Sequence, residues 1–374
     1  MKKKDQVTAA EEQKEAVQVK GKKRRAREAQ REIRWDRLDN TAHLFPVIAG
    51  ESMSNVYRIS VTLTELVDRE LLQQALDMVL PKFDGFNLRL AHPKLREKVG
   101  DSLSSDTSLN REDSFLKNYK HSSQKGYQTK RAYLLKGEKL PPGEFGVMHG
   151  YMKIPELKKV CHAYGVSINE YLVAVYVWSV YTECMHGMPS ERPVRVAVPV
   201  NLRPYFNSIT TKNFFVMVSA EFHPTKEIYT FEEVLKSVSE SLRSQISREN
   251  LEKLFSYNVS NEKLLAARIV PLFLKNLAMR YVYTTSALAN TATVTNIGNI
   301  SVSEEYRPYV EMFHAFLAMS KGQHLKGTIC SYGDTLVFSF SYDLTDTSVQ
   351  RGFFRKIAAD GIAVEIETNG VNYE

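Results

Sequence analysis

The spacing of apolar and polar residues predicts helices that alternate with strands along most of the chain. After residue 68 the apolar residues recur every three or four positions, which is typical of an amphipathic helix, and Pro81 ends the pattern. Two further helices are predicted to begin at capping boxes, which start at Ser167 and Thr230 and carry Glu three positions later. The predicted helices cover residues 68–80, 167–185, 230–246, 262–288 (broken or kinked at Pro271) and 346–359.

Runs of β-branched and aromatic residues between these helices predict the strands. They cover residues 56–63, 86–90, 127–135, 145–152, 194–199, 214–219, 291–295, 310–319, 328–331, 335–342 and 362–367. The pair Gly333-Asp334 between two of these runs is typical of a hairpin turn. Helices alternating with many strands indicate an α/β protein, organised as an α+β sandwich, with a boundary between two subdomains near residue 150.

Residues 91–110 interrupt this order of elements. The stretch is polar and shows no apolar periodicity. A loop of about 20 residues without its own secondary structure is uncommon inside a compact domain. The segment therefore calls for a separate explanation.

The positive charge is concentrated at the start of the chain. The chain has 374 residues and a formal net charge of +7, and residues 1–34 hold 12 Lys and Arg against 6 Asp and Glu. This segment is too polar to form a core, so we predict a disordered tail or a frayed helix. Residues 20–27 could contact an anionic surface weakly, but without interleaved aromatic residues they indicate no specific nucleic-acid partner.

The cysteines and the lengths of the apolar runs bear on the compartment. The three cysteines are odd in number and scattered, which is typical of reduced thiols. No apolar run reaches the about 20 residues that cross a bilayer, and the first residues do not resemble a secretory signal. We therefore expect a cytoplasmic protein.

A search for chemical motifs leaves few candidate residues. The sequence has no P-loop, dinucleotide-binding glycine fingerprint, H-E-x-x-H, C-x-x-C or G-x-S-x-G motif, and we expect no metal. Among nine histidines, His149 is the candidate base because it lies beside Gly150 at the end of a predicted strand. Residues 199–215 place polar side chains on a loop between strands, where they could either line a site or cap turns.

Several segments from residue 34 onward resemble the alcohol acetyltransferase-like branch of the CoA-dependent acyltransferases. That superfamily includes chloramphenicol acetyltransferase, wax ester synthases and peptide-synthetase condensation domains. The segments are RWDRLDNTAHLFP, VPVNLRPYFNSITTKNFF, VTNIGNI, SYGDTLVFSFSYDLTDTSVQRGFF and GIAVEIETNGV. The resemblance implies two similar subdomains, residues 35–150 and 151–374, with a channel between them. It also implies acetyl-CoA or another acyl-CoA as donor and a small alcohol as acceptor. By position, Arg203 and Asn213 would brace the channel wall, and Asn296 would line its interior near the acceptor.

The sequence lacks the catalytic motif that this resemblance implies. The family carries His-His-x-x-x-Asp-Gly, in which the second His takes the proton of the attacking acceptor. No such motif occurs here, and the polar stretch 91–113 stands where it is expected, so we interpret the first subdomain as shortened there. Three readings follow: an acyltransferase that uses His149 or His92 as substitute base, an inactive binding protein of the same fold, and a protein directed to membrane surfaces by its tail.

Overall fold

The computed structural model describes residues 42, 44–49, 56–80, 112–122, 130–263 and 270–370. The chain divides into two compact units, of which the first takes in Met1–Leu38 and Val67–Glu112 and the second Asp39–Leu66 and Asp113–Glu374. The predicted tail, His92 and most of the shortened stretch 91–113 lie outside the described residues. The division into residues 35–150 and 151–374 stays a prediction.

The described part of the first unit is the helix α3 (Arg69–Val79). The Asp68 side chain accepts hydrogen bonds from the backbone amides of Glu70 and Leu71, which fixes the start of the helix. The amphipathic helix predicted at residues 68–80 is thereby confirmed.

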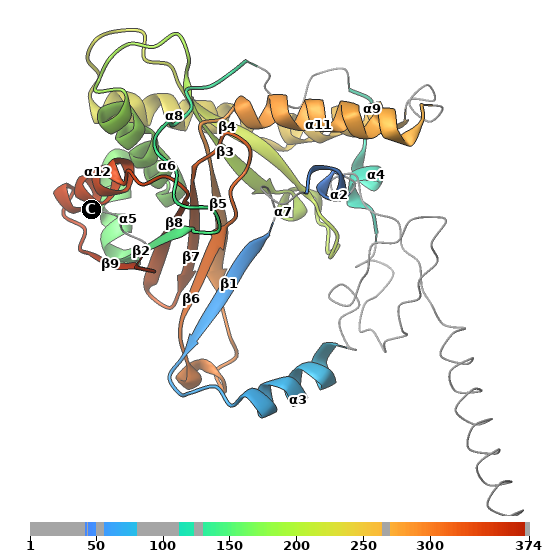
Figure 1. The fold of residues 1–374 in the computed structure, drawn as a ribbon, viewed down its shortest axis with the longest axis vertical. Helices are drawn as coiled ribbons and strands as arrows, with labels where there is room; N and C mark the ends of the chain where they lie inside the picture. The colour runs from blue at the N-terminus through green and yellow to red at the C-terminus, as the bar shows by residue number, and fades with distance from the viewer. Residues whose placement is uncertain are drawn as a thin grey trace, which may run out of the picture. The chain divides into compact units, whose positions relative to one another are not determined.

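The second unit is built on a seven-stranded mixed sheet with the strand order β4-β3-β5-β7-β8-β2-β9. β5 runs parallel to both β3 and β7, and the other neighbouring pairs are antiparallel. The strands are β2 (Gly146–Lys153), β3 (Val194–Asn201), β4 (Phe215–Phe222), β5 (Ala292–Ile300), β7 (Leu325–Tyr332), β8 (Thr335–Tyr342) and β9 (Val364–Thr368). Figure 1 shows a separate antiparallel ribbon, β1 (Tyr57–Leu63) with β6 (Val310–Leu317), whose β6 strand packs against β7 and β8.

Helices pack on one face of the large sheet and form the core with it. Phe338 and Phe340 on β8 contact Phe353 on α12, with ring centroids 4.4 and 5.0 Å apart. The ring of Phe354 approaches β2 so closely that a Cβ at Gly150 would lie 2.2 Å from it, so only glycine fits there. The helices of this unit are α2 (Phe45–Ile48), α4 (Ser114–Asn118), α5 (Ile154–Tyr164), α6 (Ile168–Ser179), α7 (Arg203–Phe206), α8 (Phe231–Gln245), α9 (Arg248–Lys263), α11 (Leu272–Leu288) and α12 (Ser348–Ala359). A π-helical turn (Val180–Cys184) continues α6, and a 3₁₀ turn (Arg307–Tyr309) precedes β6.

One predicted strand is wrong in its described part. Residues 130–135 of the run 127–135 form no strand, because their amides bond to separate parts of the chain instead of to one neighbouring strand. Ala132 N–H donates to the carbonyl of Leu288, and Tyr133 N–H donates to that of Pro193. The apolar composition of residues 130–135 therefore reflects burial of this segment and not hydrogen bonding to a neighbouring strand.

None of the helices in the described ranges is long and apolar enough to cross a membrane.

Candidate functional site

The face of the large sheet opposite the core helices carries a row of polar side chains. Successive side chains of a strand point to opposite faces, and Phe338 and Phe340 on β8 pack against the core helices. Ser339 between them therefore points to the other face. The register places His149 on β2 and Thr328 on β7 directly opposite Ser339, so the three side chains form one row across neighbouring strands.

His149 is held in this row as a neutral imidazole. Its Nδ1 lies 2.7 Å from Oγ of Ser339, and its ring centroid lies 4.7 Å from that of His314 on β6. Burial, and secondarily the neighbouring His314, lowers the pKa of His149 to about 4, while Glu367 opposes the shift. The ring is therefore uncharged at neutral pH and is a weaker base than a free imidazole.

A tyrosine and a carboxylate orient the second histidine. The Tyr151 hydroxyl donates to Oε2 of Glu367 on β9 at 2.5 Å and lies 2.8 Å from Nε2 of His314. Because the tyrosine has one proton to give, His314 donates through Nε2–H and keeps Nδ1 as its basic nitrogen. Burial lowers the pKa of His314, while burial and the bond to Glu367 raise the pKa of Tyr151. Ser339 therefore holds the ring of His149, and Tyr151 holds the ring of His314.

A buried lysine lies beside the row. Lys326 on β7 is 6% exposed, and its Nζ donates to the carbonyl of Ala318 and the hydroxyl of Ser320. Burial lowers the pKa of Lys326 to about 8. The hydroxyls of Thr328 and of Ser341, which pairs with Lys326 across the strands, have no hydrogen-bond partner among the described residues.

The other predicted site residues lie on other elements of the second unit. Arg203 hydrogen-bonds to the backbone of the loop that follows it. Its Nε donates to the carbonyl of Thr210, and a terminal nitrogen donates to that of Lys212. Asn213 ends the same loop just before β4. Asn296 is exposed on β5, where its Oδ1 accepts the amide of Gly298.

The register places Asn296 beside Ile329, which lies opposite Phe338 and so on the helix side of the sheet. In the described structure no hydrogen bond or ring contact joins Arg203 or Asn296 to His149. Their proposed channel roles therefore stay predictions.

The sequence did not single out Tyr151, His314, Glu367 or Lys326. Each lies in or beside a run that was predicted as a strand, but only the pairing of strands far apart in sequence brings them to one place. Tyr151 is 163 residues from His314 and 216 from Glu367. The sequence could have pointed to these residues only by showing polar side chains at strand positions where apolar ones are expected.

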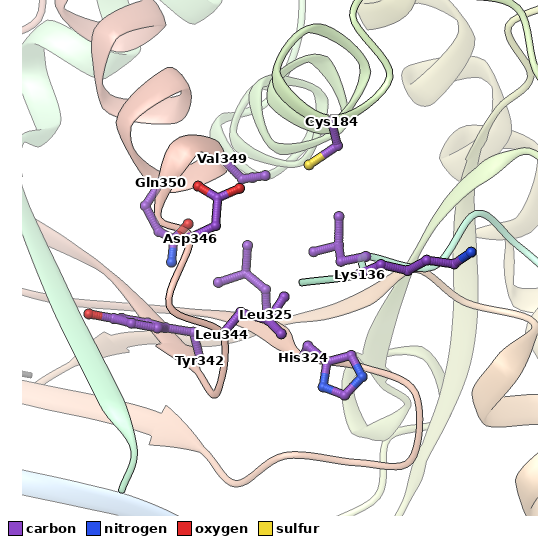
Figure 2. A pocket seen from close by; sticks show the side chains of 10 residues that line it. Lys136, Cys184, His324, Leu325, Tyr342, Leu344, Asp346, Val349 and Gln350 are labelled. Carbon is purple, nitrogen blue, oxygen red and sulfur yellow. The ribbon is translucent and has the colours of Figure 1, made fainter. Parts of the chain in front are cut away.

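Figure 2 shows a small cavity on the helix side of the sheet. Its volume is about 20 Å³, enough for one water molecule and too small for a substrate. It is lined by Leu135, Lys136, Cys184, His324, Leu325, Tyr342, Leu344, Asp346, Val349 and Gln350. Both amide atoms of Gln350 are buried without a hydrogen-bond partner in the described structure, which suits a bound water.

The cysteines are not suited to act as nucleophiles. Burial raises the pKa of Cys184 to about 11, helped by Asp346 and Glu183, and raises that of Cys161 to about 12 and that of Cys330 to about 11. A thiol is reactive only as thiolate. Within the described ranges, no group of three His, Cys, Asp or Glu side chains could hold a metal ion.

We therefore expect the three free thiols to react slowly with Ellman's reagent at pH 8 in the native protein. Unfolding in urea should make all three titrate within the mixing time. A thiol that reacts rapidly in the native state would contradict the raised pKa values.

The lowered pKa values predict that acid destabilises the fold. An unfolded histidine titrates near 6.5, so above that pH both states are neutral and the full stability is present. As the pH falls from about 6.5 to about 4, His149 and His314 become protonated in the unfolded chain but stay neutral in the folded protein. The folded state therefore loses stability relative to the unfolded state. His149 accounts for a loss of unfolding free energy on the order of 2 kcal/mol over this pH range, once its partial exposure is allowed for.

Urea unfolding curves measured at several pH values test this expectation. The variant His149→Gln should show a smaller slope of unfolding free energy against pH in this window. An unchanged slope would mean that His149 titrates normally in the folded protein.

Comparison with known proteins gives a likeness of fold at low sequence identity. No protein-family profile matches the chain, and no curated protein matches it. Among solved structures, the wax ester synthase/diacylglycerol acyltransferase from Marinobacter aquaeolei VT8 aligns with a TM-score of 0.50 and 12% identity, over 87% of this chain and 100% of that one. The trichothecene 15-O-acetyltransferase TRI3 from Fusarium sporotrichioides aligns with a TM-score of 0.42 and 14% identity, over 60% and 48%. The nonribosomal peptide synthetase FmoA3 aligns with a TM-score of 0.42 and 15% identity, over 62% and 22%.

The α/β fold predicted from the sequence is thereby confirmed. At 12% identity the likeness to the wax ester synthase concerns architecture and leaves the substrate open. The chain has a mixed α/β fold similar to that of this wax ester synthase/diacylglycerol acyltransferase.

Proposed function

We propose that the chain is a CoA-dependent acyltransferase that moves an acetyl or longer acyl group from acyl-CoA to an alcohol. The observation that carries the proposal is the neutral His149, fixed by Ser339 and flanked by His314 on the polar face of an acyltransferase-type sheet. Arg203, Asn213 and Asn296 are proposed substrate-binding residues, and the reduced thiols suit a cytoplasmic setting.

In the proposed reaction the imidazole of His149 takes the proton of the acceptor hydroxyl. The alcohol oxygen then forms a bond to the thioester carbonyl carbon as the C–S bond breaks. The departing CoA sulfur receives the proton back from the imidazolium, which leaves an ester and free CoA. Ser339 holds Nδ1, so Nε2 is the nitrogen that exchanges the proton.

The direct test is release of free CoA thiol from acetyl-CoA in the presence of short alcohols. Release that depends on both enzyme and alcohol supports the proposal, and ester formation should match it in amount. The unreactive cysteines of the native protein leave the thiol assay with a low background. No release above the buffer rate with any alcohol would contradict acyl transfer.

The pH profile is predicted to differ from that of an ordinary histidine base. A base must be neutral, and the pKa of His149 is lowered to about 4. We therefore expect kcat/KM, measured on protein that is still folded, to stay level as pH falls from 8 to about 5.5. A half-maximal rate near pH 6.5 would assign the proton transfer to another group.

A binding protein without turnover is the second candidate. It is favoured by the low pKa of His149, which makes a weak base, and by the lack of a His-His-x-x-x-Asp-Gly motif in the sequence. Calorimetric titration with CoA separates the two candidates. Saturable binding without thiol release supports this second function.

A further inference from the structure

The helix α11 turns large apolar side chains toward solvent. Phe273, Leu277 and Tyr281 are spaced by four residues, so they lie on one face, and they are 70%, 65% and 73% exposed. Lys275 and Asn276, on another face of the helix, are less exposed than these. A surface helix ordinarily shows the reverse arrangement, with apolar residues inward. Figure 1 shows α11 in orange, along the upper edge of its unit in this view.

The helix is nevertheless anchored to its own unit. Arg280 Nε donates to the carbonyl of Val47 in the turn of α2 at 2.8 Å, and Ala287 near the C-terminal end is buried. The apolar row from Phe273 to Tyr281 spans about 12 Å, or two helical turns. Scattered exposed apolar residues need no explanation, but a row of this kind on a fixed helix indicates a binding surface.

The charge around the helix points to the kind of partner. Residues 264–303 contain no Asp or Glu, whereas Arg268, Lys275 and Arg280 fall within them. A basic segment with one apolar face is typical of helices that lie in the interface of an anionic membrane. A second copy of the chain would instead bring the same cations against one another, which disfavours pairing through this face.

We propose that α11 docks on the surface of a bilayer that contains anionic phospholipids. The helix lies in the plane of the interface, with Phe273, Leu277 and Tyr281 among the headgroups and upper acyl chains. Arg280, which is seven positions after Phe273 and so on the same side of the helix, lies near the lipid phosphates. This binding does not depend on acyl transfer, and it would also hold for an inactive protein of the same fold.

Co-sedimentation with vesicles tests the proposal on the full chain. Vesicles of phosphatidylcholine with phosphatidylserine should bind the protein, and vesicles of phosphatidylcholine alone should bind it at least about tenfold more weakly. The double variant Phe273→Asp and Leu277→Asp should reduce binding to the anionic vesicles by about tenfold or more, with an unchanged melting temperature because both side chains are exposed. The matched control is Ile228→Asp, which is 78% exposed elsewhere and should bind like the wild type.

A second variant separates the helix from the basic tail. Replacing Lys22, Lys23, Arg24 and Arg25 by Gln removes charge from residues 20–27 and leaves α11 intact. Binding that survives this change but not the α11 variant supports the proposal. Binding lost only with the tail variant overturns it, and so does self-association in solution that the α11 variant abolishes without any vesicle binding.

Discussion

Replacing His149 by alanine is expected to lower kcat/KM for acyl transfer by about 10²- to 10⁴-fold, the usual effect of removing a general base. The imidazole is neutral and half-buried, and its Nδ1 is hydrogen-bonded to Ser339, so alanine would remove both the proposed base and that contact. Initial rates of thiol release at saturating and limiting alcohol give kcat and kcat/KM for the variant and the wild type.

The matched control is His162→Ala, because His162 is exposed on α5. It should retain the wild-type rate. CoA binding by the His149 variant, measured in parallel, shows whether the site has kept its shape. Wild-type activity in the His149 variant would remove this residue from the proposed mechanism and leave His314 as the next candidate.

Replacing Arg195 by methionine is expected to lower the free energy of unfolding by about 1–3 kcal/mol, the usual cost of leaving a buried hydrogen-bonding group unsatisfied. The Arg195 side chain is 4% exposed, and it pairs at 2.7 Å with Glu221 on the neighbouring strand, whose side chain is 41% exposed. Its guanidinium also donates to the backbone carbonyls of Lys130 and Ala289. Methionine of similar length would leave the buried carbonyl of Ala289 without this donor.

The control for Arg195 is Lys153→Met. Lys153 pairs with Asp334 at a similar distance, 2.9 Å, but the two side chains are 54% and 65% exposed. Exposed ion pairs contribute about 0–1 kcal/mol, so this variant should unfold almost like the wild type in urea. If both variants lowered the free energy of unfolding equally, burial would not determine how much these ion pairs contribute to stability.

Elements with a local signal were predictable from the sequence. Both predicted capping boxes form at the starts of α6 and α8, and the predicted turn at Gly333 joins β7 to β8 with a positive φ of 60°. These features depend on residues within four positions of one another, so the sequence is sufficient to predict them.

Other elements could not be predicted from local patterns. The local pattern gave no prediction of α9, whose buried residues Leu251, Phe255 and Val259 form a narrow row among polar residues. It also missed α5, which begins with Ile154 directly after β2 and so continues an apolar run. In both cases packing against the sheet or its helices, rather than local pattern, stabilises the helix.

The candidate site was predictable only at its first residue. His149 lies on a strand as expected, but in the middle of β2 and not at a strand end. Its neighbours Tyr151, His314 and Glu367 come together through strand order and register, which depend on contacts across much of the chain. Propensity and periodicity contain no information on which distant strands become neighbours.

The position of β2 in the sheet has a consequence for how the protein is made. Both neighbours of β2 are strands from the C-terminal end, β8 and β9, so Gly146 pairs with Tyr342 and Met152 with Val364. During synthesis on the ribosome β2 emerges long before either partner and has unpaired hydrogen-bonding groups along both edges. Nascent chains of this protein are therefore expected to need chaperones, and folding to be slow, until the last strands have left the exit tunnel.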